Sequence, residues 1–260
     1  MATSASVFDS NIAQWQEEMS LPWGKLKYKL VQANLAKHVA QGQWHVLDAG
    51  GGNGLDSIPL AEQGHLVDIV DYSRKMLAEA TRQAAMVNAQ ERVAVHYADV
   101  RDIVHLFPPA CFDLGLCHNV LQYVEDVPAL LKDLAALLKT GGLISVVSIN
   151  RYSIPYHAAF LNDNLIEALD QLEARKAKAK IFNATMTNYC MDEVRELLES
   201  IGCAVEKDYG IRCICDYWGN NDRKSDPAFF EQIERLEFAL TERHPYKLLA
   251  RYYQIVARKK

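Results

Sequence analysis

The sequence has 260 residues, of which 50% are hydrophobic and 23% are charged, and its formal net charge is −5. A chain of this length can bury a core of its own, and the acidic balance argues against a strongly electrostatic nucleic-acid binder. No apolar stretch is long enough to span a bilayer, and the N-terminus lacks the pattern of a signal peptide, so we expect no membrane association. The six cysteines lack metal-site spacing, which predicts free thiols in a cytoplasmic protein with no metal.

Short β-rich runs alternate with helical patterns between about residues 40 and 150. The first two strands are "WHVLDA" and "HLVDIVD", and Ser73 is placed to cap the helix "SRKMLAEATRQAAMVNAQ". The runs "RVAVHYA", "FDLGLCHNV" and "LISVVSI" follow, with the helical pattern "VPALLKDLAALLKTGG" before the last of them. This rhythm is typical of parallel βαβ units, so we predict a doubly wound α/β sheet.

The rhythm changes after Asn150. "LNDNLIEALDQLEARKAKAK" carries leucines at helical spacing, and Asn164 with Glu167 resembles a capping box, which predicts an inserted helical cap. The alternation then resumes with "MDEVRELLESIG", "AVEKDYGIRCIC", a helix near residues 227–243 and a closing strand, "LARYYQIVARK". We therefore expect a cofactor-binding half at 1–150, a cap at 151–190, and a segment at 191–260 that completes the same sheet.

Four glycines crowd the stretch "LDAGGGNG", directly after the first predicted strand. In an open α/β sheet such a turn lies beyond the carboxyl ends of the strands, where ligands bind. The dinucleotide pattern G-x-G-x-x-G fails, because its third glycine would fall at Leu55 or Ser57, and no Gly-Lys-Ser/Thr is present. A plain tight turn and an NAD site remain alternatives, since an acid such as Asp71 would serve the ribose of either cofactor.

The motif that is present is Asp48-x-Gly50-x-Gly52-x-Gly54. It resembles the D/E-x-G-x-G-x-G motif of class I S-adenosylmethionine-dependent methyltransferases, and "VDIVDYS", "VHYADVRD" and "FDLGLCHNVLQYV" resemble their next three motifs. The resemblance implies a seven-stranded, mainly parallel, Rossmann-like sheet that binds S-adenosyl-L-methionine. It also implies that Asp71 holds the two ribose hydroxyls and that Asp99 meets the adenine amino group.

Two narrower stretches, "GKLKYKLVQANL" and the tail from "DYGIRCICDY" onward, resemble the bacterial tRNA 5-carboxymethoxyuridine methyltransferases, which esterify a carboxylate on a wobble uridine. This group usually has arginine where Lys27 stands, and residues 155–190 align poorly with it. The resemblances together imply cofactor contacts by Lys27, Asp48, Gly50, Gly51, Gly52, Asp71, Tyr72, Asp99, Val100 and His118.

Four residues are candidates for positioning the methyl acceptor: His118, Tyr152, His157 and Arg212. His118 is either a general base or, as we prefer, a residue that packs and hydrogen-bonds at the cofactor. Tyr152 and His157 follow the fifth strand, and either contact substrate or pack beneath the cap. Arg212 and Arg251 must each pair with an internal acid or face a cavity, and for Arg212 we expect the cavity.

The basic cluster Arg175, Lys176, Lys178 and Lys180 is either a grip on a tRNA backbone or a solvated helix face. The acceptor is thus a tRNA carboxylate or, as the alternative, a small molecule taken up beneath a lid formed by 151–190. A third possibility is a cofactor-binding module without catalysis. A hydroxyl or amine acceptor would need a base, whereas a carboxylate would not.

Overall fold

The computed structural model describes residues 17–178 and 185–260. Its centre is a seven-stranded sheet with the strand order β3-β2-β1-β4-β5-β9-β8. The pairs β1–β2, β1–β4, β2–β3 and β4–β5 are parallel, whereas β9 runs antiparallel to both β5 and β8. The predicted mainly parallel, doubly wound sheet is confirmed. The strands are β1 His45–Ala49, β2 Leu66–Asp71, β3 Val93–Tyr97, β4 Phe112–His118, β5 Leu138–Ile149, β8 Cys203–Ile211 and β9 Tyr252–Lys259.

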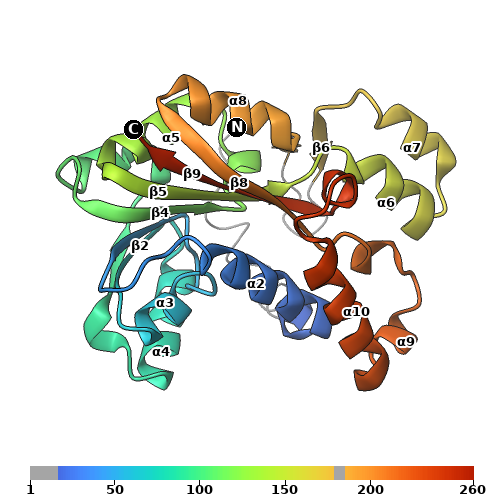
Figure 1. The fold of residues 1–260 in the computed structure, drawn as a ribbon, viewed down its shortest axis with the longest axis horizontal. Coiled ribbons are helices and arrows are strands. Elements are labelled where there is room, and N and C mark those ends of the chain that lie inside the picture. Colours follow the sequence, from blue (N-terminus) through green and yellow to red (C-terminus); the bar gives the residue numbers. More distant parts are fainter. Residues whose placement is uncertain (1–16, 179–184) are drawn as a thin grey trace.

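Helices cover both faces of this sheet (Figure 1), each face with its own buried apolar cluster. One face packs against α5 (Val127–Leu137) and α8 (Met191–Ser200). The other face packs against α2 (Pro22–Leu35), α3 (Ile58–Glu62), α4 (Arg74–Met86) and α10 (Pro227–Leu240), and α9 (Asn221–Lys224) precedes α10.

Helix starts follow the local sequence. The side chains of Ser73, Asp126 and Asp226 each accept a hydrogen bond from a backbone N–H in the first turn of α4, α5 and α10 respectively. The predicted cap at Ser73 is therefore confirmed. All six cysteines are free thiols, and five of them are buried. In the described part of the chain, no helix is long and apolar enough to cross a membrane.

The inserted segment differs from the continuous helix that the leucine spacing predicted. Helix α6 (Ser153–Leu161) is followed by α7, which spans only Leu165–Asp170, with Asn164 as its N-cap. The chain then forms a short antiparallel hairpin of β6 (Lys176–Lys178) and β7 (Thr185–Thr187). The prediction of helix over residues 171–178 is wrong; Lys180 lies outside the described residues.

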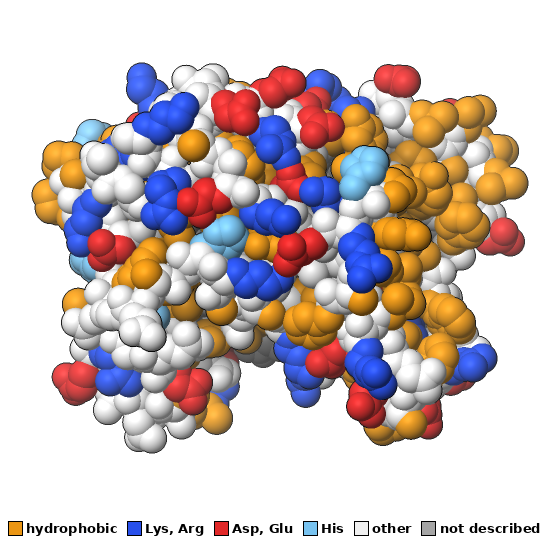
Figure 2. Space-filling model, viewed as in Figure 1, with side chains coloured by type: hydrophobic (Ala, Val, Ile, Leu, Met, Phe, Trp, Pro, Cys, Tyr) orange, Lys and Arg blue, Asp and Glu red, His pale blue; other side chains and the backbone are white. Residues whose placement is uncertain are grey.

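Absent packing explains this difference. Leu165, Leu169 and Leu172 are 72%, 70% and 53% exposed, so the periodic leucines find no partner to bury them. A short helix without tertiary packing is marginal in water, and the pattern alone does not extend it. Hydrophobic side chains consequently gather on the surface over α6 and α7 (Figure 2).

The carboxyl ends of several strands lie at one edge of the sheet, where α/β proteins bind ligands. The parallel strands β1, β2, β4 and β5 all finish there, and β8 ends at the same edge because both β8 and β5 pair antiparallel with β9. β9 begins at this edge, where the N–H of Asn150 donates to the carbonyl of Arg251 at 3.0 Å. Segments far apart in sequence thereby meet at one crevice.

Candidate active site

The glycine loop after β1 is built so that side chains are excluded. Gly50, Gly52 and Gly54 adopt φ angles of +74°, +56° and +78°, a region that residues with a Cβ rarely occupy. A Cβ on Gly50 would also lie 2.6 Å from Cγ2 of Val120. The loop is therefore more than a sharp turn, because its backbone is also packed against the segment that follows β4.

Asp71, the last residue of β2, ties this loop to the next helix. Its Oδ2 accepts a hydrogen bond from the N–H of Gly52 at 3.0 Å, and its Oδ1 accepts one from the N–H of Ser73 at 2.8 Å. Its side chain is buried at the carboxyl edge of the sheet, beside the loop, as the motif predicted. Tyr72 is partly buried between Asp71 and the cap of α4.

Two more predicted contact residues lie after β3. Val100 is buried, and its Cγ1 lies 3.5 Å from the position of a Cβ on Gly50, which places it beside the loop. Asp99 is partly exposed and accepts hydrogen bonds from the backbone N–H and the guanidinium of Arg101. These hydrogen bonds hold the pKa of the Asp99 carboxyl below its usual value.

A buried polar cluster lies behind the loop. His118, at the end of β4, has Nε2 2.8 Å from the hydroxyl of Ser145, and its Nδ1 lies 3.2 Å from Oδ1 of Asp56. Oδ2 of Asp48 has no hydrogen-bond partner among the described residues, and Nδ1 of His118 and Oδ1 of Asp56 have only each other. Buried polar atoms of this kind are costly unless a ligand or water satisfies them.

Lys27, on α2, brings a positive charge to the same cluster. Its side chain is buried, and its Nζ lies 4.9 Å from the ring centroids of both Tyr28 and Tyr252. Burial lowers the pKa of Lys27, while Tyr252 and Asp56 oppose that shift. The sequence did not indicate that Asp56 belongs to this group; its place just beyond the glycine loop is the signal that was available.

The two buried acids of the cluster respond to their surroundings in opposite directions. Burial, and next the charge of Asp56, raise the pKa of Asp48 to about 7. Burial also acts on Asp56, but His118 and Lys27 outweigh it and lower the pKa of that carboxyl. Asp56 is therefore the ionised partner of His118, whereas the carboxyl of Asp48 has a pKa close to neutral pH.

The raised pKa of Asp48 predicts that the free energy of unfolding depends on pH. The folded state retains a proton on Asp48 that the unfolded chain releases near pH 4, so the contribution of Asp48 falls as the pH rises from about 4 to 7 and then levels off. Relative to Asp48→Asn, the ligand-free wild type should lose up to about 1.4 kcal/mol of unfolding free energy per pH unit between pH 5 and 7. Denaturant titrations at pH 5, 6, 7 and 8 measure this difference.

Asp113→Asn is the matched control for the Asp48 prediction. Backbone and Lys139 hydrogen bonds outweigh burial and lower the pKa of Asp113, so its contribution should be constant over the same pH range. A difference between wild type and Asp48→Asn that stays constant from pH 5 to 8 would contradict the prediction.

A second prediction concerns His118. The ring of His118 is buried and is held by contacts with Ser145 and Asp56. We therefore expect His118→Gln to weaken cofactor binding by about tenfold, while the pH–rate profile keeps its acidic limb, the fall in rate at low pH. Calorimetry with S-adenosylmethionine and rates between pH 5 and 9 test this. Loss of the acidic limb with unchanged affinity would instead make His118 a general base.

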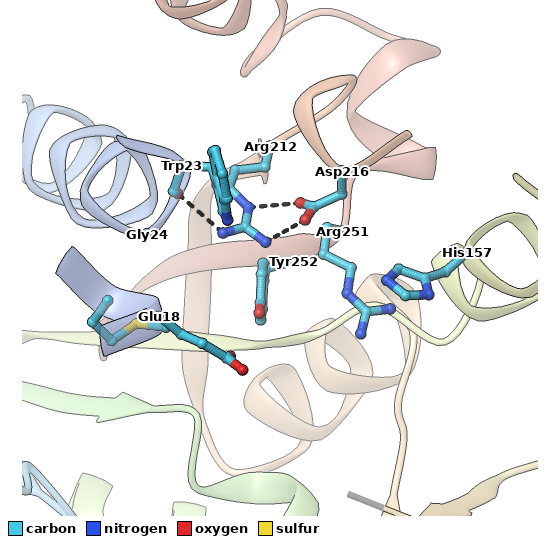
Figure 3. Close-up of a pocket in the computed structure, with 9 residues that line it drawn as sticks. Glu18, Trp23, Gly24, His157, Arg212, Asp216, Arg251 and Tyr252 are labelled. Carbon is cyan, nitrogen blue, oxygen red and sulfur yellow. Dashed lines mark hydrogen bonds and ion pairs between the residues drawn. The ribbon is translucent and has the colours of Figure 1, made fainter. Parts of the chain in front are cut away.

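A cavity of about 230 Å³ opens next to this cluster (Figure 3). It is lined by residues from the N-terminal helices, the ends of β8 and β9, and α6: Glu18, Met19, Trp23, Gly24, His157, Arg212, Asp216, Arg251 and Tyr252. Two of the predicted substrate residues, His157 and Arg212, thus meet in one cavity. Tyr152 is absent from that lining and is 44% exposed.

Arg212 does not fit the expectation of a cavity cation that awaits an anion. Its guanidinium is buried and forms a two-pronged ion pair with the carboxylate of Asp216, and a third N–H donates to the carbonyl of Trp23 at 3.0 Å. It lines the cavity, but its charge is already compensated. The correction has a physical cause, because a buried arginine without a partner is expensive and the acid four residues later is within reach.

The loop that carries Arg212 and Asp216 is held in place by a residue that lies far away in the sequence. Arg212 has a φ of +61°, and the three N–H groups of residues 213–215 donate to the carboxylate of Glu237 on α10 at 2.6 to 2.9 Å. Glu237 is fully buried. Sequence patterns gave no signal for this contact, which connects residues more than twenty positions apart.

Arg251 is the cation that faces the cavity without an acid. Its Nη1 donates to the hydroxyl of Ser153 at 3.2 Å, its N–H donates to the carbonyl of Arg212 at 3.0 Å, and it forms no ion pair with any carboxylate in the described ranges. Figure 3 shows its guanidinium beside the imidazole of His157. Arg251, not Arg212, is therefore the cavity-lining arginine whose charge is not balanced by an acid among the described residues.

Tyr252 lies at the centre of the cationic groups and was not predicted. Its ring centroid lies 4.9 Å from Nζ of Lys27, and 5.2 and 5.9 Å from the guanidinium carbons of Arg212 and Arg251. Burial raises the pKa of its phenol, but these three charges outweigh burial and lower it. Its position directly after a predicted cavity arginine was the available sequence signal.

Arg175 and Lys176 are the two residues of the predicted basic cluster whose side chains the structure describes. Arg175 forms an ion pair with Glu193 of α8, and Lys176 begins β6. The structure therefore does not bring these residues to the cavity lining.

Comparisons with known proteins show a methyltransferase domain in this chain. Residues 46–142 match a family described as "Methyltransferase domain". The tRNA 5-carboxymethoxyuridine methyltransferase of Escherichia coli K12 is 29% identical over 244 residues, which cover 91% of this chain and 89% of that protein. A ubiquinone biosynthesis O-methyltransferase of Coxiella burnetii is 37% identical over 108 residues, 41% of this chain and 44% of that protein.

Solved structures agree on the fold. An S-adenosylmethionine-dependent methyltransferase from Thermotoga maritima superposes with a TM-score of 0.66 at 16% identity, covering 98% of this chain and 99% of the other. The 1,6-didemethyltoxoflavin-N1-methyltransferase of Burkholderia thailandensis gives 0.61 at 19% identity, covering 98% and 88%. The matched methyltransferase domain contains the glycine loop and Asp71, and together these similarities indicate an S-adenosylmethionine-dependent methyltransferase.

Proposed function

We propose that this methyltransferase transfers a methyl group to the carboxylate of 5-carboxymethoxyuridine at a tRNA wobble position. The observation that carries the proposal is Arg251, a cation that lines a cavity beside the cofactor edge and has no acid partner in the part of the chain that the structure describes. An acceptor carboxylate supplies the missing negative charge, and the fork of an arginine suits it. The similarity to the E. coli enzyme over most of both chains supports the same acceptor.

The cofactor residues divide between the two ends of S-adenosylmethionine. The carboxylate of Asp71 would accept hydrogen bonds from the two ribose hydroxyls, and Asp99 would accept one from the adenine amino group, with Tyr72 and Val100 beside it. Gly50, Gly51 and Gly52 let the main chain approach closely. Lys27 neutralises the carboxylate of the methionine end, and the unpaired Oδ2 of Asp48, with the His118–Asp56 pair beside it, supplies polar partners there.

Methyl transfer to a carboxylate depends on the alignment of the two reactants more than on proton transfer. When bound, the cofactor supplies its methyl group: a new C–O bond forms as the C–S bond breaks, and the electron pair of that bond stays on sulfur. An acceptor carboxylate is ionised at neutral pH and needs no base. Arg251 orients it, and His157 completes that wall of the cavity.

The size of the cavity favours one alternative, a small-molecule O-, N- or C-methyltransferase. A volume of about 230 Å³ suits a small acceptor, and α6 and α7 of residues 151–190 would then act as its lid. A cofactor-binding module without catalysis is the third candidate. Only the tRNA candidate requires a cytoplasmic location and phosphate contacts.

Purified enzyme, radiolabelled S-adenosylmethionine and tRNA from a strain that lacks this gene test the proposal. We expect label in the wobble nucleoside, shown by mass spectrometry as conversion of the acid to its methyl ester, with a rate that falls steeply as salt rises. Methylation of a small acceptor with no salt dependence would favour the alternative. An unchanged ratio of acid to ester would rule out the tRNA version, and failure to bind the cofactor would rule out both enzymes.

A further inference from the structure

Three aromatic rings form a cluster next in sequence to residues that line the cavity. Tyr156 and Phe160 lie one turn apart on α6, with ring centroids 6.0 Å apart, and Tyr217 packs against both at 6.0 and 6.5 Å. We call Tyr156, Phe160 and Tyr217 the aromatic platform. Tyr156 precedes the cavity residue His157 in sequence, and Tyr217 follows the cavity residue Asp216.

The platform is exposed although its rings are fixed. Phe160 is 65% and Tyr156 41% exposed, so most of the Phe160 ring contacts no protein. The hydroxyl of Tyr217 donates a hydrogen bond to the carbonyl of Leu249, and this bond anchors the Tyr217 ring. A fixed and exposed aromatic surface is more costly to the free protein than scattered apolar residues and is typical of a binding site.

The location of the platform restricts what can cover it. Because neighbouring residues line the cavity, an occupant must leave the cavity open to the acceptor. An unpaired nucleobase next to the acceptor nucleotide meets this condition, since it arrives attached to the group that enters the cavity.

Resting on the proposed function, we propose that the aromatic platform stacks an unpaired base of the anticodon loop that flanks the acceptor uridine. Single-stranded nucleic acids are bound by aromatic side chains combined with basic residues, because every base has a π-face. Here Arg251 holds the acceptor carboxylate while the platform holds the neighbouring base. Stacking then adds to the phosphate contacts on which the expected salt dependence rests, in a chain whose net charge is −5.

Alanine at Tyr156 and at Phe160 tests the proposal. Stacking on one aromatic side chain changes affinity by about 5- to 150-fold, so each variant should raise KM for tRNA within that range with kcat and cofactor affinity unchanged. Phe160→Leu keeps an apolar side chain but loses the ring and should resemble Phe160→Ala, whereas Phe160→Trp should retain affinity.

Leu169→Ala and Ile166→Ala are matched controls. These aliphatic residues on α7 are 70% and 78% exposed, and their replacement should leave KM for tRNA unchanged. A direct readout uses an anticodon stem-loop with 2-aminopurine beside the acceptor: its fluorescence should fall on binding wild type and the α7 variants, but not on binding Phe160→Ala.

The outcomes separate the two proposals. Wild type that methylates neither tRNA nor the free nucleoside 5-carboxymethoxyuridine contradicts the proposed function. Wild type that methylates tRNA, combined with platform variants of unchanged KM and unchanged 2-aminopurine quenching, overturns the platform alone. Equal rates of wild type and Phe160→Ala on the free nucleoside, with a KM defect confined to tRNA, support it.

Discussion

Arg251→Ala should lower kcat/KM for tRNA by about 100-fold while the affinity for S-adenosylmethionine stays within twofold of wild type. Each hydrogen bond to a charged group contributes about 1.5 to 3 kcal/mol, and an arginine can offer two to one carboxylate. Folding should not suffer, because this guanidinium has no acid partner among the described residues to leave behind. Single-turnover methylation and cofactor calorimetry on the same preparation measure both quantities.

Arg251→Lys is the control for charge alone. It retains the positive charge but loses the fork, so it should recover only part of the activity. If Arg251→Ala weakens cofactor binding as strongly as it lowers kcat/KM, Arg251 serves the methionine end of the cofactor and the acceptor assignment fails. Activity of Arg251→Ala equal to wild type would remove the basis of the carboxylate proposal.

Gly50→Ala should abolish measurable cofactor binding and lower the unfolding free energy by about 2 to 4 kcal/mol. An alanine at φ +74° is strained, and its Cβ would overlap Cγ2 of Val120 at 2.6 Å. The backbone must then move, and the loop that contacts Asp71 moves with it. Chemical denaturation and calorimetry test the two effects.

Gly64→Ala separates conformational strain from overlap. Gly64 also has a positive φ, +103°, but a Cβ there meets nothing within 4 Å. It should therefore lose less stability than Gly50→Ala and keep cofactor binding. Val120 is itself buried, so Val120→Ala alone costs stability and is measured as the reference. In Gly50→Ala/Val120→Ala the overlap is relieved, so the loss of unfolding free energy should be smaller than the sum of the two single losses; additive losses would contradict the steric explanation.

The cofactor half of the fold could be predicted because its signals are local. Alternating strand and helix patterns, the glycines after β1 and the cap at Ser73 each depend on a few consecutive residues. The same kind of pattern failed over residues 171–178, where leucine spacing indicated a helix but the leucines of α7 and Leu172 stay largely exposed. Periodicity reports which face could be buried, not whether a partner exists.

The acceptor half could be predicted only as a set of alternatives. The expense of an unpaired buried arginine indicated that Arg212 and Arg251 were each either paired or facing a cavity, and the structure assigns one role to each. Asp56, Tyr252 and Glu237 were missed because they act through contacts between distant segments. Such contacts leave no pattern in a single sequence.

The insertion of β9 between β5 and β8 has a consequence for the order of assembly. Among the described strands β8 pairs only with β9, so β8 can join the sheet only after β9 has paired with β5. The crevice at the ends of β1, β2 and β4 needs neither strand, whereas the wall that carries Arg251 and Tyr252 needs β9. A folding intermediate without β9 would therefore hold the nucleoside crevice and lack the acceptor wall.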